Sequence, residues 1–276
     1  MTNKKILIER PTGALLSTND KKKESIWRYD NCYKMIFSIN GSMNYQMKRN
    51  DFTLSKEQFI IVNPYDEHKQ LAIENHKFLI ELDPLFLNEI ANSFNFNNYD
   101  IQFANSIQKN PQITQWAHFV NEHASMYDEK IDNSVALFLD HSLAQLAILL
   151  IKNTVGIHTQ TWNVNSFKTI SPLIYKTMEA IMEDYKHQWT LHEMANISNL
   201  SKYQFAHLFK EITGLSPYSW LQLYRIIRSQ EYLKNTGKSI LDIALDCGFS
   251  SVSVYNQLFK RLYGGTPGTF RKKLTR

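Results

Sequence analysis

Two segments of this sequence repeat each other at a displacement of 50 residues. Residues 206–217 read AHLFKEITGLSP, and residues 256–267 read NQLFKRLYGGTP. The outward positions of the two copies carry mostly side chains that form hydrogen bonds, namely Lys202, Tyr203, Gln204, His207 and Lys210 in the first copy and Val252, Ser253, Asn256, Gln257 and Lys260 in the second. These positions differ between the copies except for the lysine shared at 210 and 260. Asn and Gln suit the paired hydrogen-bonding groups of adenine, and Lys suits phosphate. This chemistry indicates contacts with a nucleic acid.

Each copy predicts two short helices joined by a tight turn. Three of these helices begin after a hydroxyl residue that is followed three positions later by Glu, Gln or Asp, a capping pattern: Thr190, Ser201 and Ser239. The fourth begins after Ser251. Apolar residues recur at helical spacing in both second helices, as Phe205, Leu208, Phe209 and Ile212 and as Tyr255, Leu258, Phe259 and Leu262. These stripes are the predicted core.

A repeated core with two different polar faces is typical of paired helix-turn-helix motifs whose second helices enter the major groove of DNA. The core repeats because the scaffold repeats, whereas the outer faces differ because each copy would read different bases. Lysine side chains and the helix N-termini at Ser201 and Ser251 would hold phosphates. Ala206 offers only a methyl group, so the first copy should show the looser base preference.

The two copies are connected by PYSWLQLYRIIRSQEYLK (217–234), which predicts a helix with Pro in its first turn. At 1.5 Å per residue this helix would be roughly 27 Å long. Successive major grooves on one side of DNA lie about 34 Å apart. The two second helices would therefore fit neighbouring grooves if the DNA bends or if one copy engages more fully.

Charge is unevenly distributed along the chain. Residues 167–276 hold 15 Lys and Arg against 8 Asp and Glu, whereas residues 1–166 hold 16 against 18. A basic C-terminal part favours a polyanionic partner. Cys32 and Cys247 fit neither a disulfide framework nor a zinc site. The sequence starts without a secretory pattern, and its most apolar stretch, 135–151, is too short to span a bilayer comfortably. We therefore expect a soluble cytoplasmic protein without a membrane partner.

The N-terminal half predicts β structure followed by helices. Residues 32–83 contain short runs typical of an antiparallel barrel or sandwich. Two of these runs flank Asn40-Gly41, which predicts a hairpin. Residues 112–127 and 134–152 have helical length and periodicity, and the polar stretch 153–166 predicts a linker.

The helix predicted at 134–152 has an unusually broad apolar stripe. The stripe includes Leu139, Leu146, Leu149 and Leu150. It is wide enough to be buried twice, once within its own domain and once against a second chain. We therefore predict a homodimer held by these leucines, and a plain core role is the alternative.

Residues 167–276 resemble the DNA-binding domain of AraC/XylS-family transcriptional regulators. The matching residues are Ala195, Ser201, Phe209, Lys210, Gly214, Pro217, Arg225, Ile243, Ala244, Gly248, Phe249, Ser251, Phe259, Lys260, Gly264, Thr266, Pro267, Phe270 and Arg271. Two positions depart from the family pattern. Ser229 replaces the small Ala that is usual in the linking helix, and Ala206 stands where the family often reads a base.

The N-terminal half resembles, more loosely, the cupin-like effector barrel of the same family. The resemblance lies in IIVNPYDEH (60–68), while Lys56-Glu57-Gln58 replaces a common Gly-Asp pair. It implies an α+β chain with a cupin-like β-barrel at 1–90, a helical dimerisation segment at 91–152, a linker at 153–166 and a double helix-turn-helix domain at 167–276. It also implies a regulator, more often an activator, that works with RNA polymerase and binds a small-molecule effector near Tyr65 and His68. Control by a protein partner is one alternative, and a cupin-type enzyme fused to a DNA-binding domain is another.

Motifs for catalysis are incomplete in this sequence, and we predict no enzyme activity and no cofactor. His192-Glu193 followed by Asn196 comes close to a zinc protease motif, but Asn replaces the second metal-binding His. The capping pattern at Thr190 already accounts for Glu193. Gly264–Gly268 follow no predicted strand and indicate a turn and not a phosphate-binding loop.

Two further sets of residues have less specific interpretations. Four residues in the β region are conceivable cupin metal ligands, His68, His76, Glu67 and Glu81, but they lack a His-x-His spacing and we predict no metal. Lys21–Lys23 predict a solvated loop, with nucleic-acid binding as the alternative.

Overall fold

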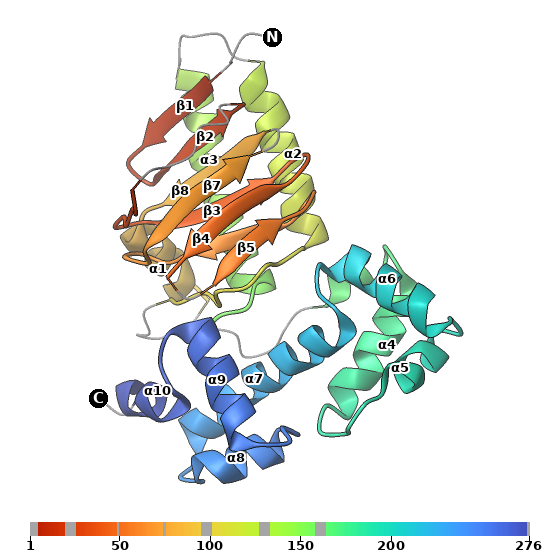
Figure 1. Cartoon of the computed structure of the whole chain (residues 1–276). Coiled ribbons are helices and arrows are strands. Elements are labelled where there is room, and N and C mark those ends of the chain that lie inside the picture. The colour runs from red at the N-terminus through yellow and green to blue at the C-terminus, as the bar shows by residue number, and fades with distance from the viewer. Residues whose placement is uncertain are drawn as a thin grey trace. The chain divides into compact units, whose positions relative to one another are not determined.

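The computed structural model describes residues 5–19, 26–48, 50–73, 76–94, 101–126, 133–157 and 164–274. They form two compact units, Met1–Thr154 and Val155–Arg276. The first unit contains the strands and three helices, and the second is built from helices (Figure 1). The predicted α+β class, with β structure preceding a helical pair of repeats, is confirmed. Lys21–Lys23 and residues 158–163 of the predicted linker lie outside the described residues.

The strands of the first unit form two antiparallel sheets. These strands are β1 (Lys5–Arg10), β2 (Gly13–Thr18), β3 (Tyr33–Ser38), β4 (Met43–Met47), β5 (Asp51–Leu54), β6 (Phe59–Val62), β7 (His68–Ile73) and β8 (Lys77–Leu82). The larger sheet has the order β1-β2-β8-β3-β6, and the smaller has the order β5-β4-β7. The predicted antiparallel β region is therefore present, but its described strands lie in two separate sheets and do not close into a barrel.

The turn at Asn40-Gly41 does not form the predicted hairpin. The flanking strands β3 and β4 lie in different sheets, so the turn carries the chain from one sheet to the other. β3 is buried along its whole length and pairs with the apolar strands β6 and β8. Packing at the centre of the larger sheet thus outweighs the local turn preference. β1 and β2, which pair across a turn at Pro11-Thr12, precede the region in which strands were predicted.

Three helices cover one face of the larger sheet: α1 (Pro84–Asn92), α2 (Pro111–Ser125) and α3 (Asn133–Asn153) (Figure 1). α2 and α3 confirm the two helices predicted from periodicity. Asp140 of α3 also forms an ion pair with Arg10 of β1, with 2.6 Å between carboxylate and guanidinium. The opposite face of the larger sheet packs on the smaller sheet through Ile36, Tyr45 and other apolar residues. The unit therefore has three layers.

The leucines expected at a dimer interface lie mainly in the core of this unit. Leu139, Leu146 and Leu150 are buried to at least 99%, and Leu149 packs against the same core. The physical reason is that α3 packs on the larger sheet, which buries its apolar stripe. With 21 residues, α3 is long and apolar enough to cross a membrane by length and composition, contrary to our expectation. Its packing is that of a core helix.

The second unit contains η1 (Asn165–Phe167), α4 (Pro172–Glu183), α5 (Leu191–Ile197), α6 (Lys202–Thr213), α7 (Pro217–Asn235), α8 (Ile240–Asp246), α9 (Val252–Tyr263) and α10 (Pro267–Leu274). The predicted two copies are α5 with α6 and α8 with α9, and α7 links them. Phe205 and Phe209 of α6 are fully buried, as are Tyr255 and Phe259 of α9. The two predicted core stripes are therefore confirmed at their central positions.

Candidate nucleic-acid interface

Local hydrogen bonds explain where the helices of the first copy begin. The Thr190 hydroxyl accepts from the Glu193 backbone N–H at 3.2 Å, and the Glu193 carboxylate accepts from the Thr190 N–H at 2.6 Å. Hydrogen bonds from the Thr190 backbone and hydroxyl, and from His187, lower the pKa of Glu193 to about 2. Ser201 and Gln204 form the same reciprocal arrangement at the start of α6. The capping role predicted for Glu193 is confirmed.

The second copy begins and ends in a similar way. Ser239 and Ser251 accept backbone N–H groups of the first turns of α8 and α9, at 3.0 and 3.3 Å. α6 and α9 end at Gly214 and Gly264, whose φ angles of 79° and 77° are left-handed. Glycine adopts this conformation without strain, which explains why a glycine follows the C-terminal end of each of these two helices. The two second helices are therefore bounded by the same local chemistry.

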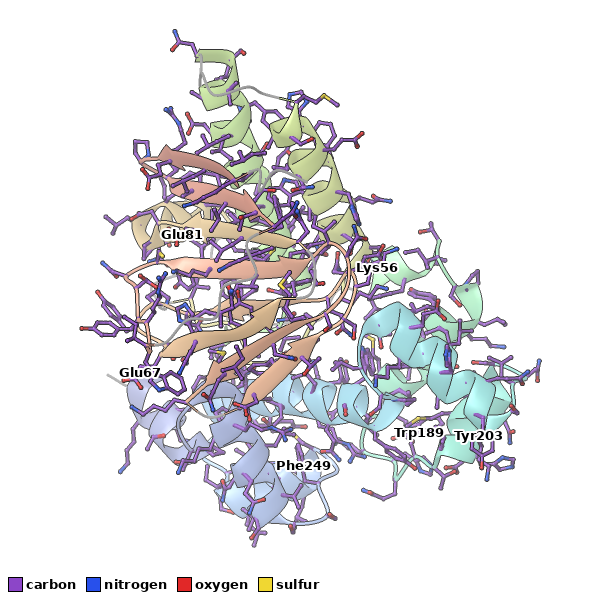
Figure 2. All side chains as sticks on the ribbon, turned by 45° about the horizontal axis from the view of Figure 1, so that its top comes forward. Lys56, Glu67, Glu81, Trp189, Tyr203 and Phe249 are labelled. Atoms are coloured by element: carbon purple, nitrogen blue, oxygen red, sulfur yellow. The ribbon has the colours of Figure 1, made fainter. Side chains whose placement is uncertain are left out.

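The polar residues of the first copy project from the outer face of α6. Tyr203 is 88% exposed and lies at the margin of the helical unit (Figure 2). The other predicted contacts on this helix are also exposed: Lys202, Gln204, His207 and Lys210, with Ser201 at its start. Ala206 is partly buried. The structure thus gathers the predicted residues of this copy on one surface.

The corresponding face of α9 carries a different set. Ser253, Gln257 and Lys260 are exposed. The remaining predicted residues are partly exposed: Ser251, Val252 and Asn256. Phe249, by contrast, lies inside the unit, where its ring packs 5.0 Å from that of Tyr255 (Figure 2).

Glu211 is an outer-face residue that the sequence analysis did not single out. Its carboxylate lies 3.8 Å from His207 Nδ1, one helical turn away. The four-residue spacing between His207 and Glu211 could have revealed the pair. The acid offsets part of the positive charge of Lys202 and Lys210, whereas α9 presents Lys260 and Arg261. Helix α9 therefore offers more net positive charge to a polyanion than helix α6 does.

The linking helix α7 has 19 residues, so it is about 28 Å long. Its unusual Ser229 is fully buried, and its hydroxyl accepts a hydrogen bond from the Tyr255 hydroxyl at 3.1 Å and donates to the Ile226 carbonyl at 2.7 Å. Burial raises the pKa of Tyr255, which keeps this donor protonated. The departure from the family pattern at Ser229 is thus matched by a partner in α9.

The expected effector residues Tyr65 and His68 lie at different cavities. His68 is 4% exposed and lines a cavity of about 160 Å³ between the two sheets of the first unit. Its other walls include the apolar residues Leu7, Ala14, Leu16, Ile36 and Leu79 and the polar residues Glu9, Arg28, Lys34, Tyr45, Lys77 and Glu81. Tyr65 is 64% exposed and borders a separate cavity with Lys48 and Glu67. Only His68 of the two lines the cavity between the sheets.

Charged groups line this cavity at two places along β8, near Glu81 and near Lys77. The Lys34 ammonium lies 2.6 Å from Asp30 and 3.1 Å from Glu81. Burial alone would lower the pKa of Lys34, but these two carboxylates outweigh that effect and raise it. Lys77 Nζ donates to Gln70 Oε1 at 2.8 Å, and the Tyr45 hydroxyl donates to the same oxygen at 3.0 Å. The cavity therefore combines apolar walls with two regions of charged and hydrogen-bonding side chains.

The conceivable metal ligands are engaged separately. His76 lies within hydrogen-bonding distance of Ser17 and Asn19, at 2.8 and 2.6 Å. Glu67 pairs with Lys48 at 3.1 Å, while Glu81 pairs with Lys34. Within the described ranges, no group of three or more His, Cys, Asp or Glu is placed to hold a metal ion.

Comparisons with known proteins concern mainly the second unit. A family model described as a helix-turn-helix domain matches residues 194–273. The HTH-type transcriptional regulator MtrA of Neisseria gonorrhoeae is 31% identical over 96 residues, which are 35% of this chain and 32% of that protein. This match therefore spans about a third of the relative's length.

Two other similar proteins cover different shares of the chain. The probable transcriptional regulator LumQ of Photobacterium leiognathi is 24% identical over 266 residues, or 93% of this chain and 95% of that protein. A crystal structure from Chromobacterium violaceum, described as a transcriptional regulator of the AraC-type DNA-binding domain-containing proteins, is 25% identical. It covers 38% of this chain and 94% of that chain, with a TM-score of 0.36.

Proposed function

Because its second unit contains an AraC-type helix-turn-helix domain, we propose that this chain is a sequence-specific DNA-binding regulator of transcription. One observation carries the proposal. Two helix-turn-helix copies share capped ends and buried aromatic cores, but present different polar faces on α6 and α9. A scaffold that is kept while its outer residues change is what reading two base sequences requires.

In this proposal the two recognition helices divide positioning from reading. Lys202, Lys210 and Lys260, together with the helix N-termini at Ser201 and Ser251, bind phosphates and set the orientation on DNA. The base-reading residues are Tyr203, Gln204 and His207 on α6 and Val252, Ser253, Asn256 and Gln257 on α9. Gln257 pairs with adenine, and Val252 packs against a thymine methyl group. The first copy has Ala206 and the acidic Glu211, which supports a weaker contribution to affinity.

We further propose that the chain acts in the cytoplasm as an activator that works with RNA polymerase, and that it catalyses no reaction. The names of the relatives describe transcriptional regulators, which supports a role in transcription. The use of Glu193 as a helix cap removes the base that a zinc protease motif would need.

The first unit is proposed to bind an effector in the cavity between its sheets, beside His68 and without a metal. The volume of about 160 Å³ suits a small organic molecule, since an engineered cavity of similar size holds benzene. The apolar walls would hold its carbon skeleton, and the polar side at Lys77 and Tyr45 would orient a polar group. Control by a protein partner is the competing form of the proposal, for which the exposed ring of Tyr65 provides a contact.

We also propose a homodimer, formed through the outer side of α2 and α3 and not through the buried leucines of α3. Phe119 and Leu137 are more than half exposed there. The Phe119 ring contacts Phe138 and His123 at centroid distances of 5.9 Å for both pairs. Burial of Phe119 and Leu137 against a second chain would remove this apolar surface from water, which supports the proposed dimer.

Selection from a randomised duplex pool by the full chain tests the central proposal. We expect enrichment of a site with two sequence blocks about one helical turn apart, because α7 separates the two recognition helices by nearly that distance. Retention of all duplexes in proportion to their abundance would contradict a sequence-specific function. A thermal-shift screen of small molecules, run beside co-purification from cells, separates the two forms of control.

A further inference from the structure

The segment between α4 and α5 is tied to the middle of α7 by a buried arginine. Arg225 is the ninth residue of α7 and is 2% exposed. Its Nε donates to the Tyr185 carbonyl oxygen at 2.8 Å, and its Nη2 donates to the His187 carbonyl oxygen at 2.7 Å. Two hydrogen bonds from one rigid guanidinium fix both the position and the direction of this segment.

The same segment also touches the second copy. Gln188 Nε2 donates to the carbonyl oxygen of Gly248, in the turn before α9, at 2.9 Å. Gly248 has a φ of 83°, and a Cβ added there would lie 2.8 Å from the Lys186 carbonyl oxygen and 3.0 Å from Arg225 Cζ. The backbone of the segment that leads into α5 therefore meets the turn before α9 at a point that admits no side chain.

These contacts join the two copies by a second route besides α7 itself. We use the term brace for residues 185–188, Arg225 and Gly248. If α7 were the sole connection, small rotations at its two ends would change the separation and direction of α6 and α9. The brace ties the chain leading into α5 and the turn leading into α9 to one point near the middle of α7, which opposes such rotations.

We propose that the brace is a positioning device that makes the chain accept one spacing between its two DNA half-sites. This inference rests on the proposed DNA-binding function. A rigid connection gives the second recognition helix a high effective concentration at the matching spacing and a very low one elsewhere. A loose connection lowers the effective concentration at the matching spacing and raises it at other spacings. The brace residues thus act on specificity through α6 and α9, without touching bases themselves.

Two variants and a control separate positioning from general support of the fold. Gln188→Ala removes one hydrogen bond from the brace and leaves the outer faces of α6 and α9 unchanged. Gly248→Ala forces a Cβ against the Lys186 backbone. Asn165→Ala is the control, because its side-chain oxygen accepts a hydrogen bond from Tyr175 at the opposite end of α4.

The probes are the duplex selected by the full unmodified chain, versions with base pairs inserted between its halves, and versions with one half scrambled. We expect Gln188→Ala to lower affinity at the selected spacing by about threefold to tenfold and to shrink the penalty for each insertion. Affinity for a duplex with a single intact half should stay within about twofold, since each helix keeps its own contacts. Gly248→Ala should lower the affinity at the selected spacing and the insertion penalty further than Gln188→Ala does. Asn165→Ala should change neither the affinity nor the insertion penalty.

A purely structural role predicts a different pattern. If Gln188→Ala leaves the spacing profile unchanged, or weakens full and half sites by one common factor, the brace does not position the helices and the inference is wrong. If Gly248→Ala fails to fold, Gln188→Ala decides the question alone. If the unmodified chain enriches no duplex, the proposed function fails before any variant is compared.

Discussion

Gln257 and Lys260 lie on the outer side of α9, about one turn apart, and differ in chemistry. The Gln amide can pair with adenine N6 and N7, whereas the Lys ammonium attracts any phosphate. Gln257→Ala should therefore cost about 1–3 kcal/mol on the selected site and little on random DNA. Lys260→Ala should weaken both and lower the salt slope by about one unit. Titrations of a mutated-site library across a salt series measure both effects.

The comparison also tests how α9 enters the groove. Our orientation would be wrong if Gln257→Ala weakened every sequence equally while Lys260→Ala changed the preferred base. The first copy supplies an internal reference, because Ala206 lacks a hydrogen-bonding group and should leave its half-site with a looser preference.

Glu193 links the stability of the first copy to pH. Its pKa of about 2 in the folded chain lies below the ordinary value of 4.5. A carboxylate whose pKa is lower in the folded chain than in the unfolded chain stabilises the fold at pH values above its unfolded pKa. This stabilisation is lost as the pH falls towards its folded pKa. At pH 6 the unmodified chain should therefore have a higher melting temperature than the Glu193→Gln variant. This difference in melting temperature, the gap, should narrow between pH 4.5 and pH 3. Thermal unfolding by circular dichroism measures the gap, and a constant gap would contradict the assignment.

Single residues were predictable where the chemistry is local. A hydroxyl residue followed by Glu or Gln three positions later identified the caps at Thr190 and Ser201, since both partners lie in one helical turn. The bond between Ser229 and Tyr255 joins residues 26 positions apart, and no sequence spacing indicates it. The separation of Tyr65 from His68 likewise depends on the sheets, because Tyr65 lies in the turn after β6 whereas His68 is the first residue of β7.

At the scale of elements, α3 provides a direct test of the corrected role of its leucines. Leu146 is fully buried in the core of the first unit, whereas Leu137 is 59% exposed. Leu146→Ala should lower the free energy of unfolding of this unit by about 2–5 kcal/mol. Leu137→Ala should change it by no more than about 0.5 kcal/mol. Urea unfolding, monitored by circular dichroism, measures both changes. Equal small changes for the two variants would contradict the core position of Leu146 and indicate a surface position.

Secondary-structure elements could be predicted from the sequence when their apolar pattern extended over many residues. The stripes of α3, α6 and α9 extend over several turns, so a local pattern was enough to define them. The strands depend on distant partners: β2 pairs with β8, and β3 pairs with β6 and β8, across gaps that no local signal spans. For the same reason Asn40-Gly41 predicted a turn correctly but not which strands it would connect.

At the scale of the whole molecule, the proposed dimer depends on the exposed side of α2 and α3. Leu137→Lys places a charge on this side and leaves the core untouched. We expect it to shift sedimentation at micromolar concentration from dimer towards monomer and to weaken binding to a two-copy site, because paired subunits bind with higher effective concentration. Leu137→Ala is the milder control. A monomeric unmodified chain at the same concentration would contradict the dimer.

The second unit should fold and bind DNA by itself, and the place where it begins affects its stability. Lys234 of α7 donates to the Ile157 carbonyl oxygen at 3.0 Å, and Val164 is buried in the core of this unit. We therefore expect a fragment of residues 155–276 to melt several degrees above one of residues 167–276, since the shorter fragment loses both contacts.

Both fragments retain α6, α9 and α7, so both should bind duplex DNA at low salt. Their affinity should fall steeply as salt rises, because each neutralised phosphate releases bound counterions. Calorimetry compares the melting temperatures, and fluorescence anisotropy at several salt concentrations compares the slopes. Equal melting temperatures would show that the contacts of Lys234 and Val164 add nothing. A folded fragment that ignored duplex DNA even at low salt would contradict the proposed function at its root, since the whole proposed interface lies within residues 201–260.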